Sequence, residues 1–206
     1  MFEKIAHCKA AVETIFMQAY NSRKGDKNME YIEKSISTKR IFDGKVIKVR
    51  VDEVELPDGK ISKREIVEHN GGVGVIPVTD DGYVFMVSQY RIAAQCMMLE
   101  IPAGKLEPGE DPLECGKREL IEETGYKGSK FTPLGAYYAT PGYCQEKLTL
   151  FLAQGLEWQG QDLDEGEFLN VHKIKLDELF DMVMDNNIHD CKTAIAILKA
   201  KAILGD

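Results

Sequence analysis

The sequence predicts an α+β fold, in which a mixed β/α/β domain follows a small N-terminal β region and a leading helix. Segments rich in Val and Ile fill most of the chain between residues 33 and 90. Helical periodicity is confined to the leading segment, one central segment and two segments at the end. The strands are not separated by regular crossover helices, which argues against a doubly wound parallel sheet.

The composition of the 206 residues excludes several classes of protein. Hydrophobic residues make up 44% and charged residues 29%, as in a globular chain rather than a disordered one. No run approaches the roughly 18 apolar residues of a membrane span. The formal net charge of −8 disfavours nonspecific binding to nucleic acid. The 5 cysteines are widely spaced without a C-x-x-C motif, which favours a reducing cytoplasm over disulfides or structural zinc.

The N-terminal extension, residues 1–28, differs from the rest because it carries a net positive charge. Apolar residues at helical spacing predict a helix over 2–20, followed by a linker. Glu3 and Glu13 interrupt the apolar run, so the segment is not a signal peptide. A packing or dimer helix, an extension without a role, and a helix that touches a membrane surface remain alternatives.

Strands are expected where β-branched residues alternate with polar ones between turn signals. Asp43–Gly44 and 57–59 mark two turns, and 80–82 marks a further hairpin. The expected strands are 35–42, 45–56, 60–69, 72–79, 83–90, 131–139, 147–153 and 168–174. The expected helices of this part of the chain are 112–124, 176–186 and 190–204.

The central helix has strong boundary signals. Asp111 is a good N-cap, and Pro112 fits the first helical position. Gly125 is a natural stop because glycine adopts the left-handed conformation that ends many helices.

Three carboxylates share one face of this helix. Glu119, Glu122 and Glu123 lie at positions i, i+3 and i+4. The face is either a solvated surface, with Arg118 paired to Glu122, or a site at which a divalent cation removes the repulsion. Oxygen ligands suit Mg²⁺ or Mn²⁺ rather than zinc.

The segment from 104 to 126 resembles the Nudix box, G-x5-E-x7-R-E-U-x-E-E-x-G-U, where U is bulky and apolar. Every fixed position matches: Gly104, Glu110, Arg118, Glu119, Leu120, Glu122, Glu123, Gly125 and Tyr126. The resemblance implies a Nudix-type α/β/α sandwich with a mixed sheet. It also implies hydrolysis of a nucleoside diphosphate linked to another group.

The same resemblance implies a metal site that needs Mg²⁺, with Mn²⁺ as an alternative. Glu119 and Glu123 would be the primary ligands, and Glu122 would support a further metal. The backbone carbonyl of Ala103 would complete the set, while Arg118 would orient the carboxylates. This fits the chemistry, because water attack on a pyrophosphate must overcome the charge of the phosphates.

The flanking motifs resemble the ADP-ribose pyrophosphatase group of the family over residues 33–200. They are Gln89-Tyr-Arg91, Leu99–Gly104 and Thr140-Pro-Gly-Tyr143, with Pro141 sixteen residues beyond Gly125. The resemblance implies cleavage of ADP-ribose to AMP and ribose 5-phosphate. It also implies a homodimer formed through an N-terminal β region, 29–69, that precedes the hydrolase domain, 70–206. The segment 70–72 departs from the pattern of relatives.

Substrate contacts carry over from the group residue by residue. Arg91 would bind substrate phosphate, for which a planar guanidinium is apt. Arg64 and Glu65 would border the adenosine, from either subunit. The other expected contacts are Leu106, Pro141, Gly142 and Glu146. For Arg91, Arg64 and Glu146 the alternative is an ordinary ion pair or a solvated acid.

A second acidic stretch, 162–171, resembles the loop that carries the catalytic base in this group. Glu165 is the expected base and Glu167 an additional metal ligand, while Gly166 would allow the loop to close. Glu122 competes with Glu165 for the role of base.

Two further functions stay open at this point. One is hydrolysis of another nucleotide sugar, such as GDP-mannose or a UDP-sugar. The other is a non-catalytic Nudix-like binding module, against which the intact box argues. In each case the expected partner is a small nucleotide-sugar molecule, without nucleic acid or membrane, in the cytoplasm.

Overall fold

The computed structural model describes residues 31–163 and 166–205. These residues form two compact units: 31–38 with Asp52–Arg64, and Lys39–Val51 with 65–205. The predicted leading helix, 2–20, and the predicted base, Glu165, lie outside the described residues.

The N-terminal β region contains the three strands that the sequence predicts. They are β1 (Lys34–Asp43), β2 (Lys48–Glu55) and β3 (Ile61–Glu68), and they form a sheet in the order β1-β2-β3. The turn before β3 closes as expected, because Gly59 has a φ of 82° and the Leu56 N–H donates to the Lys60 carbonyl over 2.8 Å.

One sheet of the second unit places β5 (Tyr83–Arg91) between two antiparallel neighbours, β6 (Cys96–Glu100) and β10 (Leu169–Lys175). Arg91 faces Cys96 in the ladder, whereas Val87 faces Glu100. Strand β6 was not expected from the sequence.

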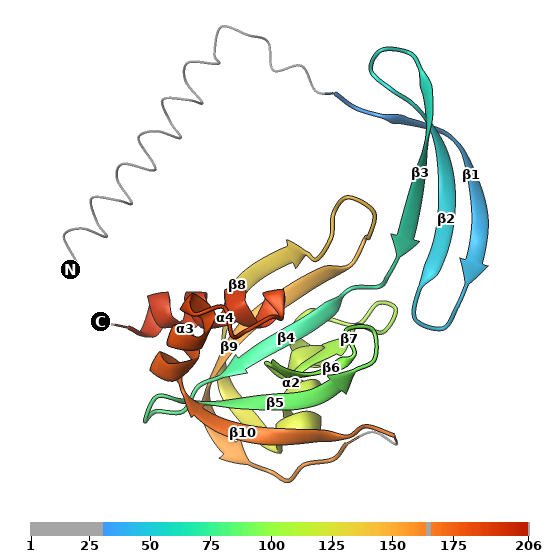
Figure 1. The fold of residues 1–206 in the computed structure, drawn as a ribbon. Coiled ribbons are helices and arrows are strands. Elements are labelled where there is room, and N and C mark those ends of the chain that lie inside the picture. Colours follow the sequence, from blue (N-terminus) through green and yellow to red (C-terminus); the bar gives the residue numbers. More distant parts are fainter. Residues whose placement is uncertain (1–30, 164–165, 206) are drawn as a thin grey trace, which may run out of the picture. The chain divides into compact units, whose positions relative to one another are not determined.

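The other sheet has the order β7-β4-β9-β8 (Figure 1). Strand β4 (Gly72–Pro77) pairs antiparallel with β7 (Ala103–Lys105) and parallel with β9 (Lys147–Trp158). Strand β8 (Tyr126–Tyr138) pairs antiparallel with β9. The sheet is therefore mixed, as predicted, although the short strand β7 was not expected.

The predicted hairpin around 80–82 is wrong. The turn forms, since the Thr79 N–H donates to the Tyr83 carbonyl over 2.8 Å. However, β4 and β5 belong to different sheets and share only an isolated bridge between Val78 and Val84. The chain changes sheet here because β7 and β9 flank β4 on both sides.

Helices cover both faces of the second unit (Figure 1). Helix α2 (Pro112–Thr124) contributes Cys115 and Leu120 to the two apolar clusters that contain Val73 and Val75 of β4. Because side chains alternate along a strand, Ile76 of β4 points away from α2.

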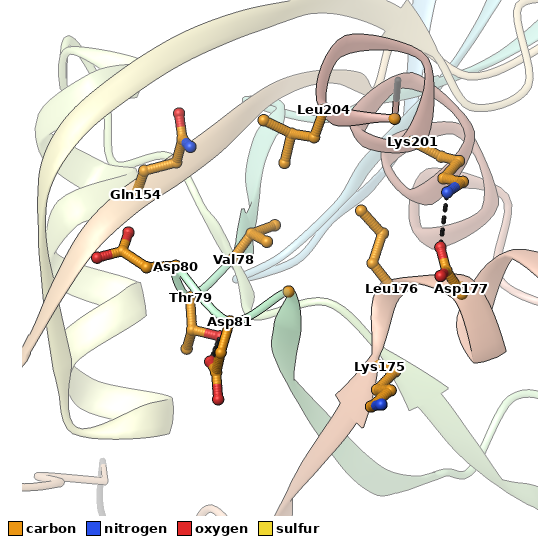
Figure 2. Close-up of a pocket in the computed structure, with 12 residues that line it drawn as sticks. Val78, Thr79, Asp80, Asp81, Gln154, Lys175, Leu176, Asp177, Lys201 and Leu204 are labelled. Carbon is orange, nitrogen blue, oxygen red and sulfur yellow. Dashed lines mark hydrogen bonds and ion pairs between the residues drawn. The ribbon is translucent and has the colours of Figure 1, made fainter.

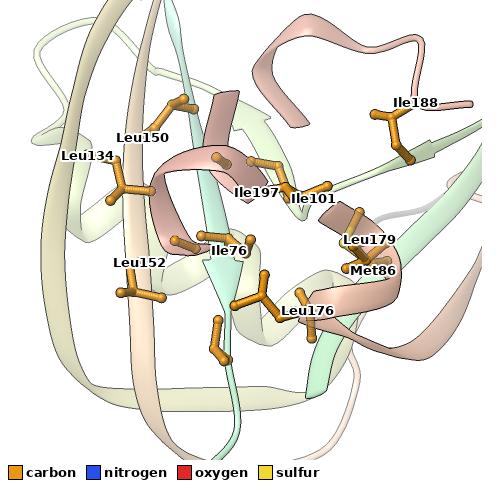
Figure 3. Close-up of a cluster of buried hydrophobic side chains, with 14 residues drawn as sticks. Ile76, Met86, Ile101, Leu134, Leu150, Leu152, Leu176, Leu179, Ile188 and Ile197 are labelled. Carbon is orange, nitrogen blue, oxygen red and sulfur yellow. The ribbon is translucent and has the colours of Figure 1, made fainter. Parts of the chain in front are cut away.

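On the opposite face, Ile76 packs with helices α3 (Leu176–Met184) and α4 (Cys191–Leu204) in the largest buried cluster (Figure 3). This cluster also includes Met86 and Leu152. The arrangement is the predicted α/β/α sandwich, with α2 on one side and the C-terminal helices on the other. In residues 31–163 and 166–205, no helix is long and apolar enough to span a membrane.

Candidate active site

The box segment forms a strand, a loop and a helix. Asp111 caps α2 as predicted, because its side chain accepts the backbone N–H of Leu113 at 2.9 Å and of Glu114 at 3.2 Å. Gly125 ends the helix with a φ of 77°. The ends of the helix are thus held by the residues that the sequence indicated, and its acidic face lies over the start of β7.

Glu123 is the most deeply buried carboxylate of the box, with 4% of its surface exposed. Its pKa is raised to about 8, mainly by burial; the hydrogen bond from Ala103 opposes the shift, and the charges of Glu119 and Glu167 contribute to it. That bond runs from the Ala103 N–H to Glu123 Oε2 over 3.0 Å. The carboxylate is thereby held on the backbone of β7.

Glu119 lies beside Glu123, one helical turn earlier. Burial raises its pKa, Arg118 opposes the shift, and Glu122 and Glu167 add to it. A Cβ atom at Gly104 would overlap the Glu119 carboxylate. The glycine of the box therefore leaves the space in which this carboxylate approaches β7.

Arg118 links three carboxylates around the helix. Its Nη1 donates to Glu119 at 2.9 Å and to Glu122 at 2.8 Å, and its Nη2 lies 3.3 Å from Glu110. The Arg118–Glu122 pair expected for a plain surface helix is therefore present. It is part of a network that also orients Glu119, so the two alternatives for this face are not exclusive.

The acidic stretch is attached to the C-terminal end of α2. The Gln161 side chain donates to the Glu123 carbonyl at 2.6 Å, and the Asp162 N–H donates to the Glu122 carbonyl at 3.2 Å. After residues 164–165, which lie outside the described residues, Glu167 is exposed, and its charge raises the pKa of both Glu119 and Glu123. The acidic stretch therefore lies on the same side as the box carboxylates.

The donor set fits an oxygen-liganded divalent cation. Glu119 and Glu123 are adjacent, largely buried acids with raised pKa values, so Arg118 at Glu119 and the Ala103 N–H at Glu123 compensate their negative charge only in part. Across the described part of the chain, no group of three or more His, Cys, Asp and Glu side chains forms a complete metal site. The pair of acids Glu119 and Glu123 suits Mg²⁺-like cations, because proteins hold these ions through one or two carboxylates, with substrate phosphates and waters as further ligands.

Arg91 lies at the end of β5 and is paired with a residue to which the sequence assigned no role. Its Nε and Nη2 donate to the two oxygens of Glu100 at 2.6 and 2.8 Å. The charge of Arg91 lowers the pKa of Glu123, which places the guanidinium within electrostatic range of the box. Arg91 thus acts electrostatically on one of the predicted metal ligands, Glu123.

Two of the predicted substrate residues, Leu106 and Glu146, lie near one loop. The Leu106 N–H donates to the Gly71 carbonyl at 3.2 Å, and the Gly71 N–H donates to His69 Nδ1 at 3.0 Å. The same nitrogen of His69 lies 3.8 Å from Glu146 Oε1. The loop 69–71 therefore connects the start of the box loop to the end of the 140–146 loop.

The remaining predicted contacts are placed as follows. Pro141 and Gly142 are exposed in the 140–146 loop, which pairs with β3 through Val67 and Cys144. Glu65 is exposed on β3. Arg64, also on β3, belongs to the first unit and pairs there with Glu33.

Sequence reasoning missed Glu100, Lys192 and Gln161. Glu100 carries a visible signal, because it is an acid inside the apolar run from Met97 to Pro102. Because a buried acid needs a cationic partner, this signal predicts an ion pair with a base such as Arg91. Gln161 has no such signal, since its partner is a backbone carbonyl.

A pocket at the other end of β4 contains none of the predicted residues (Figure 2). It lies among the β4–β5 turn, the start of α3 and the end of α4, where Lys201 pairs with Asp177 over 2.6 Å. Its lining includes Asp80, Asp81 and Asp177, but Asp81 and Asp177 are paired with Lys173 and Lys201. The pKa values of these two acids are lowered, unlike those of Glu119 and Glu123, so the box face remains the candidate active site.

Comparison with known proteins agrees with this assignment. The family model described as the NUDIX domain matches residues 68–191, more than half of the chain. A second model, described as the nucleoside diphosphate sugar hydrolase N-terminal domain, matches 33–67.

Two curated relatives and one solved structure are similar to the chain over most of its length. An ADP-ribose pyrophosphatase of Bacillus subtilis is 47% identical over 167 residues, which cover 80% of this chain and 90% of that protein. A methanol dehydrogenase activator of Bacillus methanolicus is 45% identical with the same coverage. The crystal structure of an ADP compounds hydrolase superposes with a TM-score of 0.76 at 21% identity, covering 87% of this chain and 97% of that one.

The fold, the intact box with its buried carboxylates and the family match lead to one conclusion: this chain belongs to the Nudix hydrolase family.

Proposed function

We propose that this protein hydrolyses the pyrophosphate of ADP-ribose, releasing AMP and ribose 5-phosphate. The observation that carries the reaction class is the pair of buried acids Glu119 and Glu123, held against β7 by Ala103 and Gly104. The substrate rests on the 47% identity to an ADP-ribose pyrophosphatase and on the flanking motifs around Arg91 and Pro141.

We infer that Mg²⁺ is the ion, bound by Glu119, Glu123 and the Ala103 carbonyl, with Glu122 and Glu167 available to further ions. When bound, the ion supplies charge neutralisation on the phosphates and a more acidic water. Arg118 keeps the carboxylates in place through its bonds to Glu119 and Glu122.

In the reaction, one water oxygen bonds to a phosphorus atom and the bridging P–O bond breaks, so each product keeps one phosphate. Arg91, whose charge acts on Glu123, would bind phosphate oxygens and offset their charge. The acid that removes the water proton is assigned to the acidic stretch, at Glu165. Support comes from the described residues on either side of it, because the Asp162 N–H is hydrogen-bonded to α2 and Glu167 acts electrostatically on Glu119 and Glu123. Glu122 is the weaker candidate because its carboxylate is paired with Arg118.

The adenosine and the terminal ribose have separate proposed contacts. Leu106, Pro141, Gly142 and Glu146 would line the ribose side, supported by the bonds that join their loops through residues 69–71. Arg64 and Glu65 would border the adenosine from one subunit or the other.

We also propose a homodimer, in which residues 29–69 form the dimerisation region and 70–206 the hydrolase domain. Ile36, Ile41, Phe42 and Val46, on β1 and the turn after it, are each more than half exposed. An apolar surface of this kind is typical of a protein–protein interface.

Free cysteines at Cys96, Cys115, Cys144 and Cys191 support a cytoplasmic location. The net charge of −8 supports a small-molecule partner rather than nucleic acid.

A panel assay tests the proposal. Purified protein with Mg²⁺ is given ADP-ribose, GDP-mannose and UDP-glucose, and the products are separated by chromatography. We expect the highest kcat/KM for ADP-ribose, with AMP and ribose 5-phosphate in equal amounts. A higher kcat/KM for another sugar nucleotide would replace the substrate, and no hydrolysis of any of them would overturn the enzyme assignment.

A second candidate role comes from the relative named methanol dehydrogenase activator, at 45% identity. The chain would then raise the turnover of a methanol dehydrogenase. Addition of wild-type protein and of the Glu123→Gln variant to a methanol dehydrogenase assay tests this role. Activation by the wild type alone would show that the hydrolase site is needed for it.

A further inference from the structure

Glu100 is a buried acid outside the box. Its side chain is 1% exposed at the end of β6 and is followed directly by the fully buried Ile101. A carboxylate at this depth is unfavourable unless cations and hydrogen-bond donors compensate it. The groups that compensate the charge of Glu100 therefore show which side chains this carboxylate holds in place.

Both oxygens of Glu100 are occupied by cations. Arg91 binds both oxygens through Nε and Nη2, at 2.6 and 2.8 Å, and Lys192 Nζ binds Oε2 at 2.5 Å. Burial would raise the pKa of Glu100, but Arg91 and Lys192 together bring it below its ordinary value. The acid is thus held in its charged form.

This contact determines where the Arg91 guanidinium lies. Arg91 pairs with Cys96 near the tip of the β5–β6 hairpin, whereas Glu100 pairs with Val87, four residues back along β5. The side chain of Arg91 is therefore drawn back along the sheet, away from the hairpin tip. This is the position from which its charge acts on Glu123.

One edge of the Arg91 guanidinium, formed by Nε and Nη2, binds Glu100, whereas the edge that carries Nη1 does not. Nη1 of Arg91 makes no hydrogen bond to any residue within 31–163 and 166–205, and 42% of the side chain is exposed. A planar guanidinium bound along one edge presents its remaining N–H groups in a fixed direction. Those groups are free to bind a phosphate oxygen.

Lys192 shares with Arg91 the compensation of the Glu100 carboxylate. Its Nζ also binds Asp190 at 2.9 Å, and Asp190 caps α4 by accepting the Thr193 N–H at 3.0 Å. The two acids and two bases of this network have no net charge, so the buried carboxylate is compensated while the N–H groups on the free edge of Arg91 remain available to a ligand.

We propose that Glu100 is a positioning residue, which, with Lys192, holds Arg91 so that its free edge meets the substrate pyrophosphate. The inference rests on the proposed hydrolysis of ADP-ribose and on the phosphate role of Arg91. Glu100 itself does not touch substrate. Its loss should weaken substrate binding through Arg91 and leave the box intact.

The experiment measures kcat and KM for ADP-ribose with Mg²⁺, and the Kd for ADP-ribose without metal ion, in wild type, Glu100→Gln, Arg91→Ala and the double variant. We expect Glu100→Gln to raise KM and Kd about tenfold while kcat changes by less than about threefold. In the Arg91→Ala background, Glu100→Gln should have no additional effect.

Thr193→Val is the matched control. It removes a buried hydroxyl of the same network, which accepts the Ile101 N–H at 2.9 Å, without touching Arg91 or Glu100. It should lower Tm and leave KM unchanged. If Glu100→Gln fails to fold, the charge-balanced variant Glu100→Gln with Lys192→Met replaces it and should show the same tenfold rise in KM.

Four outcomes would each overturn part of this account. A KM within twofold of wild type in Glu100→Gln, or an equal effect of Glu100→Gln with and without Arg91, would overturn the positioning role. A normal KM in Arg91→Ala would overturn the phosphate role of Arg91 and the inference with it. Failure of the wild type to hydrolyse ADP-ribose would overturn the proposed function instead.

Discussion

The backbone N–H of Ala103 donates to Glu123 Oε2 over 3.0 Å, so strand β7 and helix α2 meet at the most buried acid of the box. The hydrogen bond joins residues twenty positions apart. It places the backbone of Ala103 and the carboxylate of Glu123 at one point, as a shared metal site requires.

Glu123→Gln should abolish most of the activity while leaving the fold intact. The substitution keeps the size of the side chain and the bond from Ala103, but removes the charge that binds the metal. We expect kcat to fall about a hundredfold or more, on the order of 3 kcal/mol. Glu114→Gln, on the exposed side of α2, is the control and should leave kcat unchanged. Turnover within a few fold of wild type would remove Glu123 from the metal site.

Without metal ion, the stability of the protein should fall as pH rises. The pKa of Glu123 is about 8 when folded and has an ordinary value of 4.5. Between these values the folded state keeps a proton that the unfolded state has lost, so the free energy of unfolding decreases with rising pH. We expect a loss of about 2–4 kcal/mol between pH 5 and pH 8, measured by urea denaturation.

Two comparisons assign this pH dependence to Glu123. The Glu123→Gln variant should have a flatter profile, because the group that takes up the proton is gone. Added Mg²⁺ should restore stability to the wild type at pH 8, since it binds only the folded state. A wild-type profile that rises between pH 5 and pH 8 would contradict the raised pKa.

Gly104→Ala should impair metal binding for a steric reason. The new Cβ would overlap the Glu119 carboxylate, which must then move away from β7. We expect the Mg²⁺ concentration at half-maximal activity to rise about tenfold or more. In a Glu119→Gln background the same substitution should have a smaller additional effect, because the two act on one ligand. Equal effects in both backgrounds would show that Gly104 acts elsewhere.

Loss of the base and loss of a metal ligand should change kcat and its dependence on pH and Mg²⁺ in different ways. Glu165→Gln should lower kcat at every Mg²⁺ concentration with little change in KM, and should regain activity as pH rises and hydroxide becomes more abundant. Glu122→Gln should be milder and partly restored by excess Mg²⁺, because it loosens the Arg118 network. Measurement of kcat against pH and Mg²⁺ for both variants decides between them, and the reverse pattern would move the base to the helix.

The proposed dimer should depend on the exposed apolar side chains of β1. Phe42→Asp places a charge on this surface and should shift the mass measured by light scattering from dimer to monomer. Lys45→Asp, an exposed position in the next turn, is the control and should stay dimeric. Loss of the dimer should also lower the activity if Arg64 or Glu65 contributes to the active site of the other subunit. A dimeric Phe42→Asp variant would place the interface elsewhere.

Helix α2 could be predicted from the sequence to the residue. Its bounds, Pro112–Thr124, agree with the expected 112–124. The reason is that capping is local: Asp111 binds backbone groups two and three residues ahead, and Gly125 reverses the chain immediately after the last turn. The acidic face of the helix follows from the same local periodicity.

Strand pairing could not be predicted in this way. Strands β6 and β7 consist of Cys-Met-Met-Leu-Glu and Ala-Gly-Lys, which lack the β-branched alternation of an isolated strand signal. They are strands because β5 and β4 offer them an edge. The turn at 80–82 is also local, but whether its two strands pair depends on which sheets compete for them.

For the site, the sequence determined which acids share a face and that their pattern is that of a Nudix box. Only the tertiary structure decided that Glu123 is buried, that Gly104 makes room for Glu119 and that Arg91 is held by Glu100 and Lys192. Spacing along a helix is set by bonds between near neighbours. Burial, pKa and ion pairing depend instead on groups brought together from distant parts of the chain, such as Lys192 and Glu100, which are 92 residues apart.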